Sequence, residues 1–562
     1  MSRRAPSWVL LLIFSGTFLV YLAGNGAVGL FDRDEPRYAQ TSRQMLQSGD
    51  WVVPHFLDKI RTAKPVFIYW CQAAAMKVFG DDGFAARFPS SLAMVLTLIV
   101  LAIAIQRECG AQRGRWTAFI LGSSALAIAS AKMCLTDSVL LLWITISQLC
   151  LYRLWRRGTS APGAGRTIIV LGLSIGLAGL TKGPVALGIN LTTLIALALL
   201  GRKRERISRL TWNDFPLVAG VTLAIVFAVV SPWLYLIQHR APEFLGTAIG
   251  HDVVDRMQRG QEGHSYPPGF YSLIVWGTYF PWSLLLPAAV VWGWRRRNEP
   301  QIRFALAAWL GPWVMFELIA TKLPHYVLPT FPALAFLTAD MLVRAAARGG
   351  DALRNNHELR GGNELRGRGF RIATVGWAIF FAAAGFGPIV ALIAARQHDV
   401  TSICGGIIIA ILAVTAAYVS ADRLKADRVL AAARSMGGGM LLCVAAMWTL
   451  FLPYFQPVRI SQNAAAAIIA HGGYGEPGLM IDYKEPSLAF AQGGGLREQP
   501  ENDYLQTSDP AGWPRWVVLT GAIWDKLPEE RQKKFEIISR VVGTAYSDGG
   551  GRREVIVLRR ND

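Results

Sequence analysis

The chain has 562 residues, of which 52% are hydrophobic and only 17% are charged. Soluble domains carry about 25% charged residues. Here the apolar residues also come in blocks of about 20, which excludes a soluble globular protein and indicates a polytopic α-helical membrane protein. The net charge of +19 does not indicate nucleic-acid binding, because most basic residues lie in short loops between apolar runs. The six cysteines are scattered singly, so we expect no obligatory disulfide and no cysteine metal site.

The first apolar run, Trp8 to Leu30, is long enough to cross a bilayer, which takes about 20 residues. Arg3 and Arg4 precede this run and place the N-terminus in the cytoplasm. No cleavage site of small residues follows it, so we expect a membrane anchor rather than a cleaved signal. The cluster Asp32 to Tyr38 comes next, where this first helix meets water on the outer side.

Residues 31–86 are predicted to form a long loop on the outer side of the membrane. Within it, Pro36 to Gln47 is expected to be a surface helix, because Pro suits a first helical turn and Gly49 lies just beyond the end. Pro65 to Phe79 is apolar but too short to cross a bilayer, and this favours a helix lying in the interface.

Further apolar runs bring the predicted number of crossings to thirteen. Basic residues flank 167–200 on both sides, so both flanks are cytoplasmic and this block must cross twice, with a break at Gly183-Pro184. The thirteen crossings place the C-terminus outside. The other runs are 87–106, 115–131, 134–154, 215–237, 270–294, 303–320, 325–344, 373–395, 402–420 and 434–453.

The composition changes at about residue 456, which divides the chain into a membrane domain of residues 1–455 and a second domain of residues 456–562. The second part mixes polar and apolar residues and contains short runs typical of strands at 478–481, 516–520, 535–542 and 554–558, with a helical pattern at 527–534. We expect a small α/β domain on the outer, periplasmic side.

Carboxylates, histidines and lysines gather on the predicted outer face, whereas the cytoplasmic loops carry mostly arginines. Arginines alone set topology, but the mixed set indicates catalysis. Asp34 and Asp137 follow different spans and could converge on one cavity, as a general base or as stabilisers of a sugar cation. Lys64, Lys182 and Arg256 suit a phosphate, and a phosphate at a membrane face suggests a lipid-linked donor. The alternatives are a helix cap for Asp137 and an interfacial anchor for Lys64.

Several motifs, taken together and in order, resemble the aminoarabinose (lipid A) transferase branch of the lipid-carrier-dependent GT-C glycosyltransferases, whose superfamily includes the protein O-mannosyltransferases. They are Asp34-Glu35-Pro36-Arg37-Tyr38, Gly49-Asp50-Trp51, Lys64-Pro65, Leu135-Thr136-Asp137, Thr181-Lys182-Gly183, His251 with Arg256, and Lys322-Leu323-Pro324-His325-Tyr326.

The resemblance implies a GT-C fold, with Asp34 as the principal catalytic carboxylate and Asp137 as its partner. It also implies that Lys64, Arg256 and Tyr326 hold the phosphate of a polyprenyl-phosphate sugar. Further residues are assigned to substrate binding or to support of the loop: Glu35, Arg37, Tyr38, Lys182, His251 and Lys322. One departure is Arg61-Thr62-Ala63, where the aminoarabinose enzymes usually have Tyr-Phe-Glu; the added positive charge could suit an acidic sugar or a phosphorylated acceptor.

The predicted function is that of a bacterial inner-membrane glycosyltransferase. It would move a sugar from polyprenyl phosphate to a lipid or glycan acceptor in the periplasmic leaflet, lipid A or another cell-envelope glycan. An enzyme like the protein O-mannosyltransferases is the first alternative, and a secondary transporter is the second. Transport is disfavoured because ionisable residues cluster at one face, whereas transporters place them near the midplane. No cofactor is assigned, and the need for a divalent metal is left open.

Overall fold

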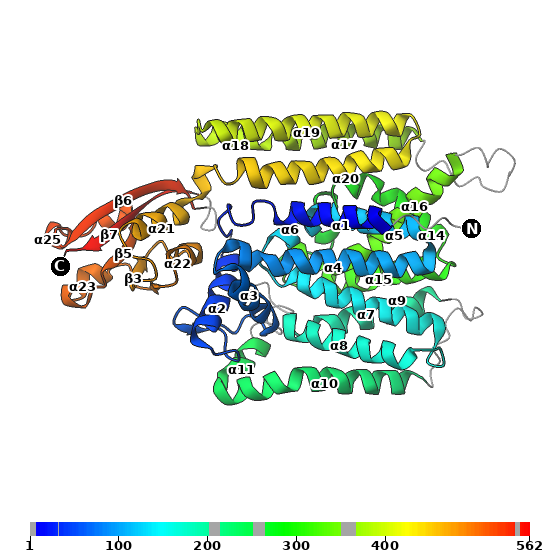
Figure 1. Ribbon diagram of the computed structural model, residues 1–562, viewed down its shortest axis with the longest axis horizontal. Coiled ribbons are helices and arrows are strands. Elements are labelled where there is room, and N and C mark those ends of the chain that lie inside the picture. The colour runs from blue at the N-terminus through cyan, green and yellow to red at the C-terminus, as the bar shows by residue number, and fades with distance from the viewer. Residues whose placement is uncertain are drawn as a thin grey trace.

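The computed structural model describes residues 7–31, 33–201, 214–250, 265–349, 367–545 and 551–561. Its long helices run side by side in one bundle, and a small domain with a sheet lies at one end of that bundle (Figure 1). Eight helical segments in the described ranges are long and apolar enough to cross a membrane. The predicted fold class, a polytopic helical membrane protein with a small C-terminal α/β domain, is therefore confirmed.

Helices of the bundle fall into two groups along the chain. The first group is α1 (Ser7–Leu22), α4 (Gly83–Cys109), α5 (Ala111–Gly122), α6 (Ala125–Lys132), α7 (Asp137–Arg157), α8 (Ala164–Lys182), α9 (Val185–Leu200), α10 (Phe215–Arg240) and α11 (Glu243–Ile249). The second group is α13 (Phe270–Thr278), α14 (Leu286–Arg295), α15 (Pro300–Leu318), α16 (Phe331–Gly349), α17 (Arg368–Gly385), α18 (Gly387–Ala395), α19 (Val400–Lys425) and α20 (Val429–Ala446). Several predicted spans correspond to short or interrupted helices, so the number of thirteen crossings stays a prediction.

The first span is shorter than predicted, since α1 ends at Leu22 rather than at Leu30. Gly24 takes a left-handed backbone conformation with a φ of 75°, and the chain then runs without a helix to Phe31. Carbonyl groups of this stretch accept hydrogen bonds from the buried Arg87, at 2.8 Å for Asn25 and 2.7 Å for Val28. A single arginine from α4 thus satisfies backbone groups that a longer helix would have satisfied internally.

The predicted break in the block 167–200 is confirmed. Helix α8 ends at Lys182, Gly183 follows with a φ of 66°, and α9 begins at Val185 directly after Pro184. Glycine supplies the left-handed conformation and proline suits the start of the next helix. This turn places Lys182 at the end of α8 that faces the outer loop.

The outer loop contains two helices, α2 (Asp34–Ser48) and α3 (Phe67–Phe79), and a two-stranded hairpin of β1 (His55–Phe56) and β2 (Lys59–Ile60). Helix α2 begins two residues before the predicted start at Pro36, because Asp34 and Glu35 occupy its first turn, where negative charge favours the helix dipole. It ends as predicted, with Gly49 as a left-handed cap whose φ is 71°.

The C-terminal domain is built on a five-stranded sheet with the order β4-β3-β5-β7-β6. Strands β3 (Gly478–Ile481) and β5 (Trp516–Thr520) match the sequence prediction, whereas β6 (Phe535–Thr544) and β7 (Arg552–Arg560) are longer than predicted. Strand β4 (Leu496–Gln499) was not predicted because its residues are mostly polar. The small helices are α21 (Ile460–Ala470), α22 (Pro486–Gln492), α23 (Tyr504–Thr507), α24 (Gly521–Trp524) and α25 (Glu529–Gln532), the last lying inside the predicted helix 527–534. The domain boundary at residue 456 stays a prediction.

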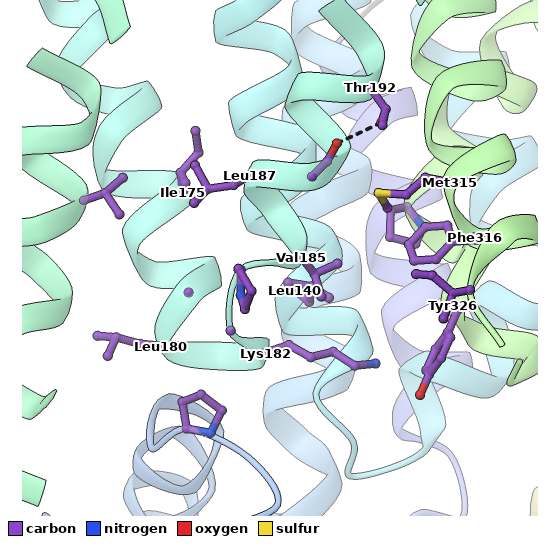
Figure 2. A pocket seen from close by; sticks show the side chains of 18 of the residues that line it. Leu140, Ile175, Leu180, Lys182, Val185, Leu187, Thr192, Met315, Phe316 and Tyr326 are labelled. Carbon is purple, nitrogen blue, oxygen red and sulfur yellow. Dashed lines mark hydrogen bonds between the residues drawn. The ribbon is translucent and has the colours of Figure 1, made fainter. Parts of the chain in front are cut away.

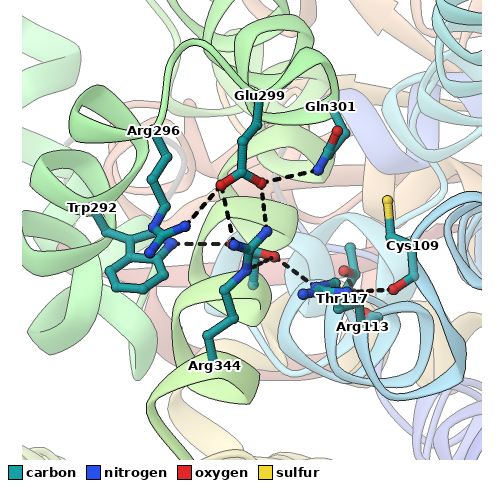
Figure 3. A network of polar contacts seen from close by, with 9 residues as sticks. Cys109, Arg113, Thr117, Trp292, Arg296, Glu299, Gln301 and Arg344 are labelled. Atoms are coloured by element: carbon teal, nitrogen blue, oxygen red, sulfur yellow. Dashed lines mark hydrogen bonds and ion pairs between the residues drawn. The ribbon is translucent and has the colours of Figure 1, made fainter. Parts of the chain in front are cut away.

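A network of charged residues lies at the end of the bundle away from the sheet domain (Figure 3). The carboxylate of Glu299 accepts hydrogen bonds from Arg296 at 2.8 Å and from Arg344 at 3.1 Å. Asp340 is buried and accepts from Arg113 at 2.6 Å and from Trp292 at 3.0 Å. These contacts join α5, α14, α15 and α16, and each carboxylate is matched by at least two donors.

Candidate functional site

A large cavity of about 1500 Å³ lies among α7, α8, α9, α10 and α15. Its wall follows α9 from Val185 to Leu200, and a helix of 16 residues is about 24 Å long. Most of the lining is apolar, including Ile175, Leu187 and Met315 (Figure 2). Leu199 lines the cavity and is 81% exposed, so the cavity opens toward the surface that would face lipid.

One end of the cavity is polar. Asp137, the first residue of α7, accepts a hydrogen bond at 2.7 Å from the Nζ of Lys182. The Nε2 of His325 lies 3.9 Å from the other carboxylate oxygen of Asp137. Lys182 also points toward Tyr326, and its Nζ lies 4.9 Å from the centre of that ring (Figure 2). Asp137 and Lys182, both predicted site residues, are thus paired at the polar end of an apolar cavity.

Lys64 reaches the same end of the cavity from the outer loop. Thr62 to Pro65 line the chamber, and the Nζ of Lys64 donates a hydrogen bond at 2.6 Å to the carbonyl of Ala63. Its positive charge also acts on the carboxylate of Asp137. The structure therefore brings Lys64, Lys182 and Asp137 to the same end of one cavity.

Asp34 lies beside this cavity rather than in its wall. Its side chain is 58% exposed, and its Oδ1 lies 3.9 Å from a guanidinium nitrogen of Arg61. Both Asp34 and Asp137 are near enough to act electrostatically on His325. The structure thus brings the two carboxylates near the same histidine, but only Asp137 lines the cavity on which both were expected to converge.

Arg61 occupies the centre of a small aromatic group in the outer loop. Its Nε donates a hydrogen bond at 3.1 Å to the hydroxyl of Tyr69, and its guanidinium lies 5.0 Å from the centre of the Tyr38 ring. Burial raises the pKa of Tyr38 well above its ordinary value, and the neighbouring Tyr69 and Asp34 raise it further. The Tyr38 hydroxyl is therefore protonated at neutral pH and able to donate a hydrogen bond.

Two predicted binding residues lie away from the cavity. The buried carboxylate of Glu35 accepts from Arg87 at 2.7 and 3.0 Å, and from the backbone N–H groups of Phe31 and Cys134. Both of its oxygens are engaged, so Glu35 supports the loop. Lys322 is buried next to α15, where its Nζ donates to the carbonyl of Ile319 at 2.6 Å. Neither residue lines the large cavity.

Arg37 faces a different, smaller pocket between α2 and the C-terminal domain. The predicted residues His251 and Arg256 lie outside the described residues.

His325 was not among the predicted site residues, although it directly precedes Tyr326 in a motif singled out in the sequence. Within the described ranges, no group of three or more His, Cys, Asp or Glu residues could hold a metal ion.

Comparisons with known proteins agree with this geometry. Residues 7–245 match the family model described as dolichyl-phosphate-mannose-protein mannosyltransferase. The undecaprenyl phosphate-α-4-amino-4-deoxy-L-arabinose arabinosyl transferase of Serratia proteamaculans is 31% identical over 341 residues, which are 60% of this chain and 60% of that protein. The enzyme of the same name from Pseudomonas aeruginosa is 31% identical over 388 residues, covering 68% of this chain and 66% of that protein. The chain thus matches about three-fifths of the length of the first of these relatives.

The solved structure of ArnT from Cupriavidus metallidurans bound to undecaprenyl phosphate superposes with a TM-score of 0.74. The alignment covers 99% of this chain and 98% of ArnT, at 20% identity. This chain has the GT-C fold. The predicted resemblance to lipid-carrier-dependent glycosyltransferases is confirmed, and the archaeal oligosaccharyltransferase AglB from Archaeoglobus fulgidus is a more distant neighbour, with a TM-score of 0.52 at 11% identity, covering 98% of this chain and 74% of AglB.

The cavity and its polar end have features that would suit a lipid phosphate. The apolar chamber suits a long hydrocarbon chain, and the lysines at its polar end suit the phosphate. Asp34 lies partly in water beside this end, where it can accept a proton from an acceptor or stabilise positive charge on a sugar. An apolar chamber and a polar, partly hydrated region therefore adjoin each other within a few side chains.

Proposed function

We propose that this chain is a glycosyltransferase that moves a sugar from a polyprenyl-phosphate donor to a periplasmic acceptor, lipid A or another cell-envelope glycan. The observation that carries the proposal is the apolar cavity along α9, which ends at Lys64, Lys182 and Asp137. The names of the relatives and the undecaprenyl phosphate bound to ArnT support the same donor class.

In this proposal the polyprenyl chain lies along α9 and its phosphate lies near Lys64 and Lys182. Arg256, outside the described residues, is proposed as a further phosphate ligand, with His251 nearby. Asp34 acts on the acceptor or on the sugar, and Asp137 fixes Lys182. Tyr38, whose ring stacks on Tyr69 and lies beside Arg61, supports the outer loop.

We further propose that the protein lies in the bacterial inner membrane, with its N-terminus in the cytoplasm and its C-terminal domain in the periplasm. Helix α1 begins at the opposite end of the bundle from the sheet domain (Figure 1). The end that holds Arg113, Arg296 and Arg344 would face the cytoplasm, as the positive-inside rule requires. Reporter fusions at Arg360 and Asp562 should report opposite sides, and the same side for both would contradict this orientation.

The experiment that tests the activity is transfer in proteoliposomes that contain the purified chain, a radiolabelled polyprenyl-phosphate sugar and a phosphorylated glycolipid acceptor. We expect label to move to the acceptor without any gradient across the vesicle. A secondary transporter would instead move a solute when a gradient is imposed and leave the lipid-linked sugar intact. That second result would overturn the proposal.

A further inference from the structure

A second pocket of about 420 Å³ lies where α2 meets the C-terminal domain. Charged side chains from both parts of the chain line it, with the cationic groups in a slight majority. They are Arg33 and Arg37 from the outer loop, and Asp482, Lys484, Glu485, Glu498 and Arg553 from the domain. None of these seven residues lines the proposed donor cavity, although Arg37 was assigned from the sequence to substrate binding or loop support.

This pocket lies at the carboxyl edge of the parallel part of the sheet. Strand β3 pairs in parallel with β4 on one side and with β5 on the other. Strand β4, which follows β3 in the chain, lies on one side of β3, and β5, which follows β4, lies on the other side. The end of β3 is therefore the point at which the direction of the strand order reverses. Open α/β sheets bind their ligands in the crevice at such a switch point. Asp482, the first residue after β3, lines the pocket.

The backbone of Asp482 is held in an uncommon conformation, with a φ of 64°. Its carboxylate accepts a hydrogen bond at 2.6 Å from the hydroxyl of Thr520, the last residue of β5, and lies 3.6 Å from the guanidinium of Arg553. Non-glycine residues in this conformation cluster at ligand sites. These contacts tie the ends of β3, β5 and β7 together around one polar space.

Two charged side chains of opposite sign face this space without a protein partner among the described residues. Arg37 and Glu498 both line the pocket, and the side chain of neither makes a hydrogen bond or ion pair with another described residue. An arginine can grip a phosphate with two parallel hydrogen bonds. A carboxylate accepts hydrogen bonds from hydroxyl groups. Together the two residues suit a phosphorylated sugar.

The pocket is fixed in place next to the reaction site by a second arginine of α2. Arg43 is buried, donates at 2.7 Å to the carbonyl of Phe490 in the C-terminal domain, and pairs with Asp81 at 3.1 Å. Helix α2 therefore carries Asp34 beside the donor cavity and Arg37, three residues on, at this second pocket. Residues three apart on a helix have Cβ atoms about 5–6 Å apart, so a ligand held at Arg37 lies on the side of α2 that carries Asp34.

We propose that this pocket binds the phosphorylated sugar headgroup of the acceptor. The acceptor role rests on the proposed function, whereas the binding of a phosphorylated sugar can be measured without it. Arg37 and Arg553 hold the phosphate, and Glu498 binds sugar hydroxyls. The C-terminal domain thereby presents the acceptor to the helix that carries Asp34.

The first experiment measures binding of glucose 1-phosphate and inorganic phosphate to the full chain in detergent. We expect Arg37→Gln and Arg553→Gln to weaken binding of glucose 1-phosphate about tenfold or more, since each removes a charge-assisted hydrogen bond. Glu498→Gln should weaken binding of glucose 1-phosphate but not of phosphate. Arg540→Gln is the matched control, because Arg540 pairs with Glu554 outside the pocket. Equal binding by all variants and the parent chain, or no binding at all, would overturn the site.

The second experiment separates a lipid headgroup from a soluble sugar phosphate. The parent chain should bind phosphatidylcholine vesicles that contain a phosphorylated disaccharide glycolipid more tightly than phosphatidylcholine vesicles alone, and glucose 1-phosphate should compete. In transfer assays, Arg37→Gln should raise the KM for that glycolipid about tenfold and leave the KM for the polyprenyl donor unchanged. An unchanged acceptor KM would overturn the acceptor role while the parent's transfer still upheld the proposed function. If the parent chain itself transfers no sugar, the proposed function and the acceptor role fail together, and the binding of glucose 1-phosphate still tests the pocket.

Discussion

Two clusters of charged residues lie at opposite ends of the same helical bundle, and they differ in how their charges are matched. In the network around Glu299 and Asp340, both carboxylates take hydrogen bonds from at least two donors, and neither carboxylate lines the large cavity (Figure 3). At the other end, Asp137, Lys182 and His325 line that cavity, and Asp34 lies largely in water. Closed networks stabilise a fold, whereas a cluster that faces a cavity leaves charge for a ligand.

The largest difference between the two clusters should appear at Asp34. Asp34→Asn keeps the shape of the side chain and removes its charge, so we expect turnover to fall at least about a hundredfold. Thermal unfolding in detergent should be nearly unchanged, because the side chain is exposed. Turnover with a lipid-linked sugar and a glycolipid acceptor measures the effect. Asp58→Asn, an exposed aspartate of the same loop, is the control; equal turnover of the two variants would remove Asp34 from the chemistry.

An aspartate-to-asparagine change in the network around Glu299 and Asp340 should instead lower stability and leave substrate binding unchanged. Asp340→Asn removes the charge that Arg113 and Arg344 share, and hydrogen bonds to charged groups contribute about 2 kcal/mol each. We expect a free energy of unfolding lower by about 2 kcal/mol, and an unchanged KM for both substrates in the protein that remains folded. A variant with normal stability and impaired donor binding would contradict the structural role.

A smaller effect should follow from pH at the same network. Burial opposes the charge of Glu299, but hydrogen bonds from Arg344 and Arg296 outweigh it and hold the pKa below its ordinary value of 4.5. A lowered pKa in the folded state means that the network contributes its full stability above about pH 4.5 and loses it as the pH falls through the folded pKa. Unfolding measured in detergent from neutral pH downward should show this loss, and Glu299→Gln should flatten it. An identical acid dependence in both proteins would contradict the prediction.

The sequence predicted much of this arrangement, for physical reasons that can be named. Helix α2 followed from Pro36 and Gly49, and the break between α8 and α9 followed from Gly183-Pro184, since these residues restrict the backbone locally. The end of α1 at Leu22 could not be predicted, because it depends on Arg87, a residue far along the chain.

The site was predicted in part. Lys64, Asp137, Lys182 and Tyr326 do meet at one cavity. Asp137 and Lys182 lie at the ends of α7 and α8 on the same side of the bundle, and the long outer loop brings Lys64 to them. The separate positions of Glu35 and Arg37 were not predicted. They lie two residues apart on α2, about 200° around the helix axis, and so face different surroundings.

The central claim is that the apolar cavity holds a polyprenyl phosphate with its phosphate at the polar end. Binding of undecaprenyl phosphate and of uncharged undecaprenol to the purified chain tests this directly. We expect undecaprenyl phosphate to bind much more tightly than undecaprenol. Lys64→Ala and Arg256→Ala should each weaken the binding of undecaprenyl phosphate about tenfold or more. The same variants should leave the weak binding of undecaprenol unchanged. Equal affinity for the two lipids, or normal affinity of Lys64→Ala for undecaprenyl phosphate, would contradict the account.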